Sequence, residues 1–209
     1  MALPLRYPAA VLNVPFDFGP FPELRTERLW LRPLDSIDVD DIFAYRGDPV
    51  VQLYNSKPHE TIEETLAFIE QQHALYRQQR ECLWAVTLPY TEQDATRRDG
   101  KVGCVIGEVS IQDWDRYHRH ANIGYDFSRA FWGKGFAHEA ARAVLRFGFE
   151  RMQLNRIEIW TAAANTRSVR LAERLGFTRD GLLRRRILED DGAFHDSALY
   201  GLLRSEWAA

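Results

Sequence analysis

A glycine-rich turn leads directly into an amphipathic helix in the segment Phe131-Trp132-Gly133-Lys134-Gly135-Phe136-Ala137-His138-Glu139-Ala140-Ala141. Two glycines one residue apart allow backbone N–H groups to approach a ligand without intervening side chains. The helix that follows directs its unpaired N–H groups and the positive end of its dipole toward the same point. Such an arrangement is typical of a phosphate-binding site.

The spacing of the two glycines excludes two common nucleotide-binding turns. A P-loop requires the pattern G-x-x-x-x-G-K-[ST], whereas Lys134 stands between the glycines and Phe136 follows the second one. A dinucleotide-binding turn requires a third glycine at the position of His138. A lone G-x-G also occurs in ordinary loops before helices, so other parts of the chain must support the phosphate interpretation.

The composition is that of an ordinary soluble globular protein. With 45% hydrophobic and 27% charged residues in a chain of 209, one domain with a sizeable core is expected. The net charge of −3 argues against bulk nucleic-acid binding, which favours a strongly basic chain. No apolar run reaches the roughly 20 residues of a membrane helix, and no signal peptide is recognisable. We therefore expect a cytoplasmic protein with no membrane partner.

The sequence predicts no metal site. Four acidic and histidine side chains lie close together in a polar turn but lack a metal-ligand spacing: Asp113, Asp115, His118 and His120. The two cysteines, Cys82 and Cys104, fall in apolar runs and are interpreted as core residues.

The order of predicted elements indicates a single α/β (or α+β) domain over residues 25–209. Residues 1–24 carry five prolines and are expected to form an extended arm on the domain or on a partner subunit. Strand-like runs and helical patterns then follow in the order strands, helix, strand, helix and strands, which favours a mixed sheet. The helix after the turn is expected to reach about Met152. The oligomeric state is left open, a homodimer included.

Ordered motifs across residues 24–207 resemble the GNAT superfamily of N-acetyltransferases, in its RimJ/RimL-like branch. The motifs are Ile123-Gly124-Tyr125, the G-x-G turn, Leu154-Asn155-Arg156, Asn165 and Ser168 as N-x-x-S, Arg174-Leu175-Gly176-Phe177 and Glu206-Trp207. The resemblance implies a mixed central sheet that is split around an acyl-CoA site, with helices on both faces. The chain departs from the family pattern at Ala130, where Gln or Arg is usual.

The resemblance also implies which residues hold acetyl-CoA. The backbone of Tyr125, Asp126 and Phe127 is expected to pair with the pantetheine arm in the gap between strands 121–127 and 156–161. The diphosphate is expected on the N–H groups of Trp132, Gly133, Lys134, Gly135, Phe136, Ala137 and His138, to which the Lys134 side chain can add a charge. Asn165 is expected to contact the pantetheine arm as well as cap a helix, and Arg174 (or Arg170) to reach the 3′-phosphate.

The resemblance identifies the catalytic groups less completely than the residues that hold acetyl-CoA. Many family members use a Tyr at the position of Ala172, so the predicted proton donor here is Ser168 of the N-x-x-S motif. A Glu that is common in the family is replaced by Ala121 and Asn122. Glu108 is therefore the first candidate for the base. His120, Asp126 and a water molecule without a dedicated base remain alternatives.

These expectations predict an acetyl-CoA-dependent N-acetyltransferase. The acceptor is a primary amine, either a protein N-terminal α-amine or a small molecule, and transfer is direct within a ternary complex. One alternative is a non-catalytic acyl-CoA-binding sensor or assembly module on the same fold. A second is an acyltransferase that uses a longer or different acyl-CoA.

Overall fold

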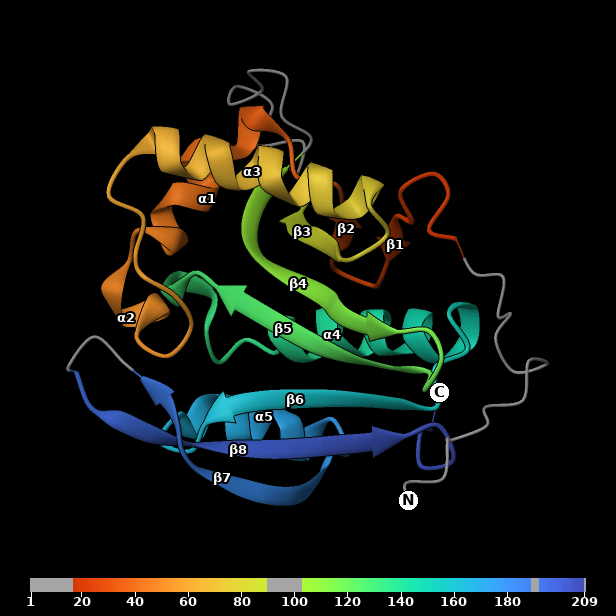
Figure 1. Cartoon of the computed structure of the whole chain (residues 1–209). Coiled ribbons are helices and arrows are strands. Elements are labelled where there is room, and N and C mark those ends of the chain that lie inside the picture. Colours follow the sequence, from red (N-terminus) through yellow and green to blue (C-terminus); the bar gives the residue numbers. More distant parts are fainter. Residues whose placement is uncertain (1–16, 90–102, 189–191, 209) are drawn as a thin grey trace, which may run out of the picture.

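Helices cover both faces of one mixed β-sheet in the computed structural model of the chain (Figure 1). The structure describes residues 17–89, 103–188 and 192–208. Within these residues, the helices are α1 (Val39–Arg46), α2 (Pro49–Gln52), α3 (Ile62–Arg77), α4 (Phe136–Arg146) and α5 (Thr166–Arg174). The strands are β1 (Leu24–Arg25), β2 (Trp30–Arg32), β3 (Cys82–Leu88), β4 (Cys104–Asp115), β5 (His120–Phe127), β6 (Arg156–Ala162), β7 (Thr178–Leu188) and β8 (Phe194–Leu203). The predicted fold class is confirmed.

The sheet is split between its two central parallel strands. The strand order is β1-β2-β3-β4-β5-β6-β8-β7, and β5–β6 is the parallel pair. These two strands pair only where His120 to Asn122 face Arg156 to Glu158. Beyond this point they diverge, as Figure 1 shows, so the edge of β5 that faces β6 has no strand beside it from Ile123 onward.

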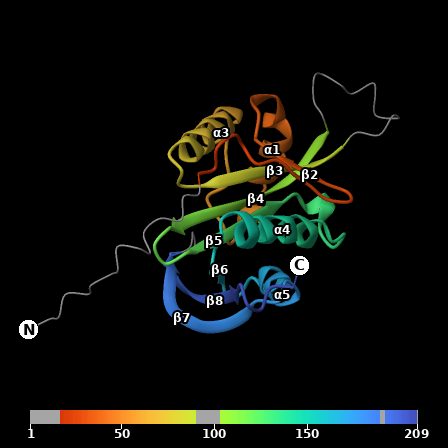
Figure 2. The same ribbon diagram turned by 90° about the vertical axis from the view of Figure 1, so that its right-hand side faces the viewer.

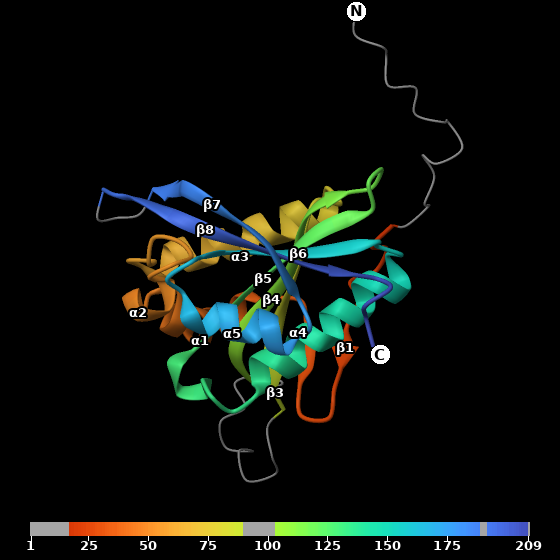
Figure 3. The ribbon, with the colours of Figure 1, turned by 90° about the horizontal axis from the view of Figure 1, so that it is seen from below.

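Each face of the sheet has its own hydrophobic core. Figure 2 shows α1 and α3 on one side of β3 and β4, with α4 on the other. Ile42, Tyr45 and Ile69 pack with Leu83 and Ala85 on the first side. The larger core on the opposite side contains the helices α4 and α5, which Figure 3 shows side by side.

The helix after the glycine turn ends where predicted, but its last turn is of another type. The α-helix ends at Arg146, and a π-helical turn, Phe147–Arg151, continues it to the predicted end near Met152. The π-helical turn passes close to β6. A Cβ atom added to Gly148 would lie only 2.8 Å from Ile157 Cδ1 of that strand. Glycine at this position allows the close approach.

Part of the proline-rich arm lies on the domain. Phe18 is buried and stacks on Tyr76, with ring centroids 5.5 Å apart. Trp84 Nε1 donates to the Pro22 carbonyl at 2.6 Å. Residues 1–16 of the predicted arm are outside the described residues. Among the described helices, none is long and apolar enough to cross a membrane.

Candidate functional site

The glycine turn presents a run of free backbone donors. Gly133 and Gly135 have φ values of 75° and 82°, a conformation that side chains disfavour. From Gly133 to His138, no N–H group has a hydrogen-bond partner among the described residues. The Trp132 N–H, by contrast, donates to the Arg129 carbonyl at 3.1 Å. The free run therefore begins at Gly133.

A cavity of about 860 Å³, here called the turn cavity, lies in front of these donors. It extends from the turn to the open end of β5 and the start of α5. Most predicted site residues line it: Tyr125, Asp126, Phe127, Trp132, Gly133, Gly135, Phe136, Ala137, His138, Asn165, Ser168 and Arg174. A Cβ on Gly133 would meet nothing within 4 Å, so the space above the turn is open. Free donors beside open space fit a diphosphate.

Lys134 is placed differently from the other turn residues. It is absent from the lining of the turn cavity. Its Nζ lies 5.4 Å from the centre of the Phe131 ring, and its carbonyl accepts a hydrogen bond from Arg28 Nη1 at 3.2 Å.

Asn165 serves as the N-cap of α5 with only one end of its amide. Its Oδ1 accepts from the Ser168 N–H at 3.2 Å. The other end, Nδ2, has no partner among the described residues. The capping role thus leaves one donor for a ligand in the turn cavity, so the two roles of Asn165 do not compete.

The Ser168 hydroxyl is paired with a phenol. Tyr125 OH lies 2.8 Å from Ser168 Oγ, and both residues line the turn cavity. Burial raises the pKa of Tyr125 to about 12, although the hydrogen bond with Ser168 opposes this shift. Tyr125 therefore remains protonated at neutral pH. The sequence predicted only the backbone of Tyr125 for the site, and its phenol was missed.

A second cavity, of about 430 Å³, lies on the α1/α3 face and is here called the sheet cavity. Its floor is the polar face of β4 and β5, and its wall includes α3. The two cavities share five lining residues: Tyr54, Asn55, Tyr125, Asp126 and Ser168. They therefore meet at the split in the sheet.

Two buried carboxylates face each other across β4 and β5 in the sheet cavity. Glu108 pairs in register with Asp126, and both line this cavity. Glu108 Oε2 accepts from Tyr45 OH at 2.8 Å, and Oε1 binds the Arg46 guanidinium. Glu108 is thus already bound by two donors.

The environment of Asp126 perturbs its acidity. Burial, followed by the negative charge of Glu108, raises the pKa of Asp126 to about 7. Arg46, at 4.0 Å, and hydrogen bonds from Gln52 and Asn55 oppose this rise. Asp126 therefore exchanges its proton near neutral pH.

His120 is not brought into the site. It lies at the closed end of the β5–β6 pair, where its Nε2 is 3.9 Å from Asp115 Oδ2. It lines neither of the two cavities. In the described part of the chain, no group of three or more His, Cys, Asp or Glu side chains is arranged to hold a metal.

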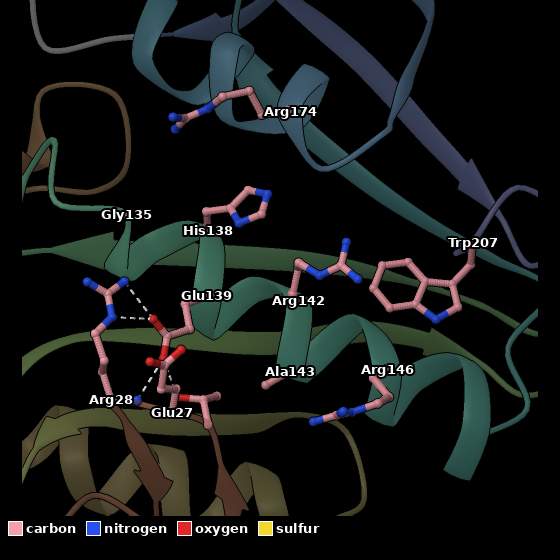
Figure 4. Close-up of a pocket in the computed structure, with 11 residues that line it drawn as sticks. Glu27, Arg28, Gly135, His138, Glu139, Arg142, Ala143, Arg146, Arg174 and Trp207 are labelled. Carbon is pink, nitrogen blue, oxygen red and sulfur yellow. Dashed lines mark hydrogen bonds and ion pairs between the residues drawn. The ribbon is translucent and has the colours of Figure 1, made fainter. Parts of the chain in front are cut away.

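A basic groove of about 670 Å³ follows α4 away from the turn (Figure 4). It shares Gly135, His138 and Arg174 with the turn cavity. Figure 4 shows His138 and Arg142 projecting from α4, with Arg174 on α5 beyond them. The groove therefore places positive charge beside the free N–H groups.

The first half of the chain supplies site residues that sequence reasoning missed. Arg46 ends α1, and Tyr54 and Asn55 follow α2. No sequence motif marks these residues. The asparagine that binds Asp126 is recognisable only once the two segments are seen together.

Comparisons with known proteins support one family. The profile of the acetyltransferase (GNAT) domain matches residues 28–178. YoaA of Bacillus subtilis, described as an uncharacterized N-acetyltransferase, is 32% identical over 88% of this chain and 98% of its own.

Two solved structures have the same fold. RimL, a ribosomal L7/L12 alpha-N-protein acetyltransferase in complex with coenzyme A, superimposes with a TM-score of 0.73 at 19% identity, over 87% of this chain and 98% of its own. The spermidine N-acetyltransferase of Vibrio cholerae, in complex with CoA and spermine, gives 0.71 at 22% identity, over 87% and 98%. At these identities, the likeness shows the fold alone.

The split sheet, the free amides of the turn and these matches agree, and the chain belongs to the GNAT family of acetyl-CoA-dependent N-acetyltransferases.

Proposed function

We propose that the protein transfers the acetyl group of acetyl-CoA directly to a primary amine in a ternary complex, as a member of the RimJ/RimL-like branch. The meeting of the two cavities at Tyr125, Asp126 and Ser168 is the observation that carries the proposal. It gives a carrier and an acceptor separate cavities and a common point of contact. Holding two reactants together in this way supplies a large part of a rate enhancement.

The turn cavity holds the carrier in this proposal. Acetyl-CoA supplies an activated acyl group as a thioester. The free N–H groups from Gly133 to His138 bind the diphosphate, and the unpaired edge of β5 at Tyr125 to Phe127 binds the pantetheine arm. Arg174, with His138 beside it in the basic groove, receives the 3′-phosphate.

Asp126 accepts the proton of the attacking amine. An alkylammonium with a pKa near 10.4 is almost fully charged at neutral pH, so a base must remove its proton. Glu108 was the first candidate from the sequence, but it is bound by Tyr45 and Arg46. In this proposal burial and the charge of Glu108 keep the pKa of Asp126 high, and Asp126 takes the proton.

Ser168 and Tyr125 donate a proton to the departing thiolate. A thiol with a pKa near 8.5 is a good leaving group, so a hydroxyl is a sufficient donor. The hydrogen bond between the two hydroxyls orients Ser168 Oγ at the point where the cavities meet.

The comparisons do not favour a non-catalytic sensor, because the relatives are named N-acetyltransferases. A sensor would bind acetyl-CoA but release no thiol above the buffer rate. Thiol release from acetyl-CoA with a mixed panel of primary amines therefore tests the proposal. The cytoplasmic location and the absence of a nucleic-acid partner stay predictions.

A pair of glycine variants tests the role of the turn. Gly135 and Gly192 both have positive φ and room for a methyl group, but only Gly135 borders the turn cavity. Gly135→Ala is expected to weaken coenzyme A binding in isothermal titration, whereas Gly192→Ala leaves it unchanged. Equal effects of the two variants would contradict the assigned diphosphate site.

A further inference from the structure

The sheet cavity has no free cation for a negatively charged acceptor. Among the described residues that line it, Arg46 is the only basic one. Its guanidinium binds Glu108 and lies 4.0 Å from Asp126, so its charge is already balanced. An acceptor that carries a carboxylate would therefore find no uncompensated positive charge there.

Free hydrogen-bond acceptors, in contrast, line the same cavity. The Glu81 carboxylate has neither a hydrogen-bond nor an ion-pair partner among the described residues. Asn122 Nδ2 donates to Asp113 Oδ2 at 2.8 Å, which leaves the amide oxygen of Asn122 as an acceptor. The oxygen of Gln72 is buried without a partner. These groups favour an occupant with several N–H donors and a positive charge.

Glu81 lies at the opposite end of the cavity from the reaction point. Ala85 pairs with Glu108, which pairs with Asp126, and Glu81 precedes Ala85 by four residues. Four residues of extended chain span about 13 Å. A molecule that reaches both Asp126 and Glu81 must therefore be elongated.

We infer that the acceptor is a linear diamine whose reacting amino group lies beside Asp126 and whose distal ammonium pairs with Glu81. The inference rests on the proposed function and specifies the class of its acceptor. The methylene chain would lie along the β4–β5 floor and beneath α3, and the distal charge would select diamines over monoamines of equal length.

The acidity of Glu81 agrees with this arrangement. Burial raises the pKa of Glu81 to about 7, and the charges of Glu108 and Asp113 add to the rise, while Arg46 and Arg80 oppose it. A bound ammonium stabilises the carboxylate form and so releases the proton. Diamine affinity should therefore increase from about pH 6 to about pH 8, where the ammonium, with a pKa near 10.4, stays charged.

Isothermal titration with the coenzyme A-bound protein tests the inference. The probes are 1,6-diaminohexane and hexylamine, which differ only in the distal amino group. We expect the wild-type protein to bind the diamine about tenfold more tightly, as one partly buried ion pair allows. Glu81→Gln should abolish the preference, whereas Glu70→Gln, a change on the exposed face of α3, should preserve it.

Several results would overturn the inference. These are equal affinity of the wild-type protein for the two amines, an unchanged preference in Glu81→Gln, or tighter binding of a short peptide amine. If Glu81→Gln fails to fold, the wild-type preference for the diamine over hexylamine is measured between about pH 6 and about pH 8, because both amines contact Asp126 and only the diamine reaches Glu81. A preference that does not change over this range contradicts the role of Glu81. Thiol release with hexylamine tests the proposed function separately: turnover without a diamine preference contradicts the inference alone.

Discussion

Replacing Ser168 by alanine tests the proposed donor. The variant loses a hydroxyl that lies 2.8 Å from Tyr125 OH. General acid catalysis contributes about 10²–10⁴-fold to a rate. Because the leaving thiol has a pKa near 8.5, the donor is needed less than for a more basic leaving group. We expect kcat to fall by about 10²-fold or less, which corresponds to at most about 2.7 kcal/mol in the barrier.

The KM for acetyl-CoA should change little, because the free amides of the turn remain in place. Ser168 is only 8% exposed, so loss of its hydrogen bond should cost about 1 kcal/mol of unfolding free energy. For a chain of this size, that lowers the melting temperature by about 2–4 °C. Steady-state thiol release and thermal unfolding measure the two effects separately.

A double-mutant cycle with Tyr125→Phe sharpens the test. If the two hydroxyls act as one donor unit, the double variant loses no more activity than the worse single variant. Additive losses would mean that the hydroxyls act independently. An unchanged kcat with a large rise in the KM for acetyl-CoA would refute the donor role and make Ser168 a binding residue.

Three further predictions concern protonation and packing. Asp126→Asn should remove the rise of kcat/KM through about pH 7. Its melting temperature at pH 8 should not be lower than that of the wild-type protein, because the raised pKa of Asp126 means that its ionisation costs stability, a cost that is complete above about pH 7. Burial raises the pKa of Glu139, but hydrogen bonds from the turn around Arg28 lower it by more, so Glu139→Gln should cost about 1 kcal/mol near pH 7 in urea unfolding. That difference should disappear as the pH falls through the folded-state pKa. Gly148→Ala should cost about 1–3 kcal/mol in the same assay, whereas Gly181→Ala, with open space around it, should cost less.

Most of the residues that line the turn cavity could be predicted from sequence, because they belong to local motifs. The two glycines, the start of α4 and the Asn165 cap are local features, and the turn cavity includes all three. The direction in which a side chain points is harder to predict from neighbouring residues in the sequence. Lys134 turns toward Phe131 and not into the cavity, which the spacing of the turn does not determine.

The contacts within the sheet cavity could not be predicted in the same way. Arg46 and Asn55 reach Glu108 and Asp126 from more than sixty positions away, and these contacts exist only because α1 and α2 cover one face of the sheet. The same tertiary packing is the reason that Asp126, and not Glu108, is the proposed base. Sequence alternation placed Glu108 on a defined face, but the donors that bind it come from elsewhere in the chain.

The short parallel pairing of β5 with β6 has a consequence for folding. Three residue pairs join the strands on either side of the split, so β6, β7 and β8 depend on the packing of α4 and α5 for their attachment to the rest of the molecule. A ligand that fills the split bridges both sides and stabilises the native state by mass action. Without it, amide protons of the C-terminal strands should exchange through a partial opening at lower free energy than those of β3 and β4. Coenzyme A should slow that exchange selectively, so the carrier also serves as a structural part of the sheet.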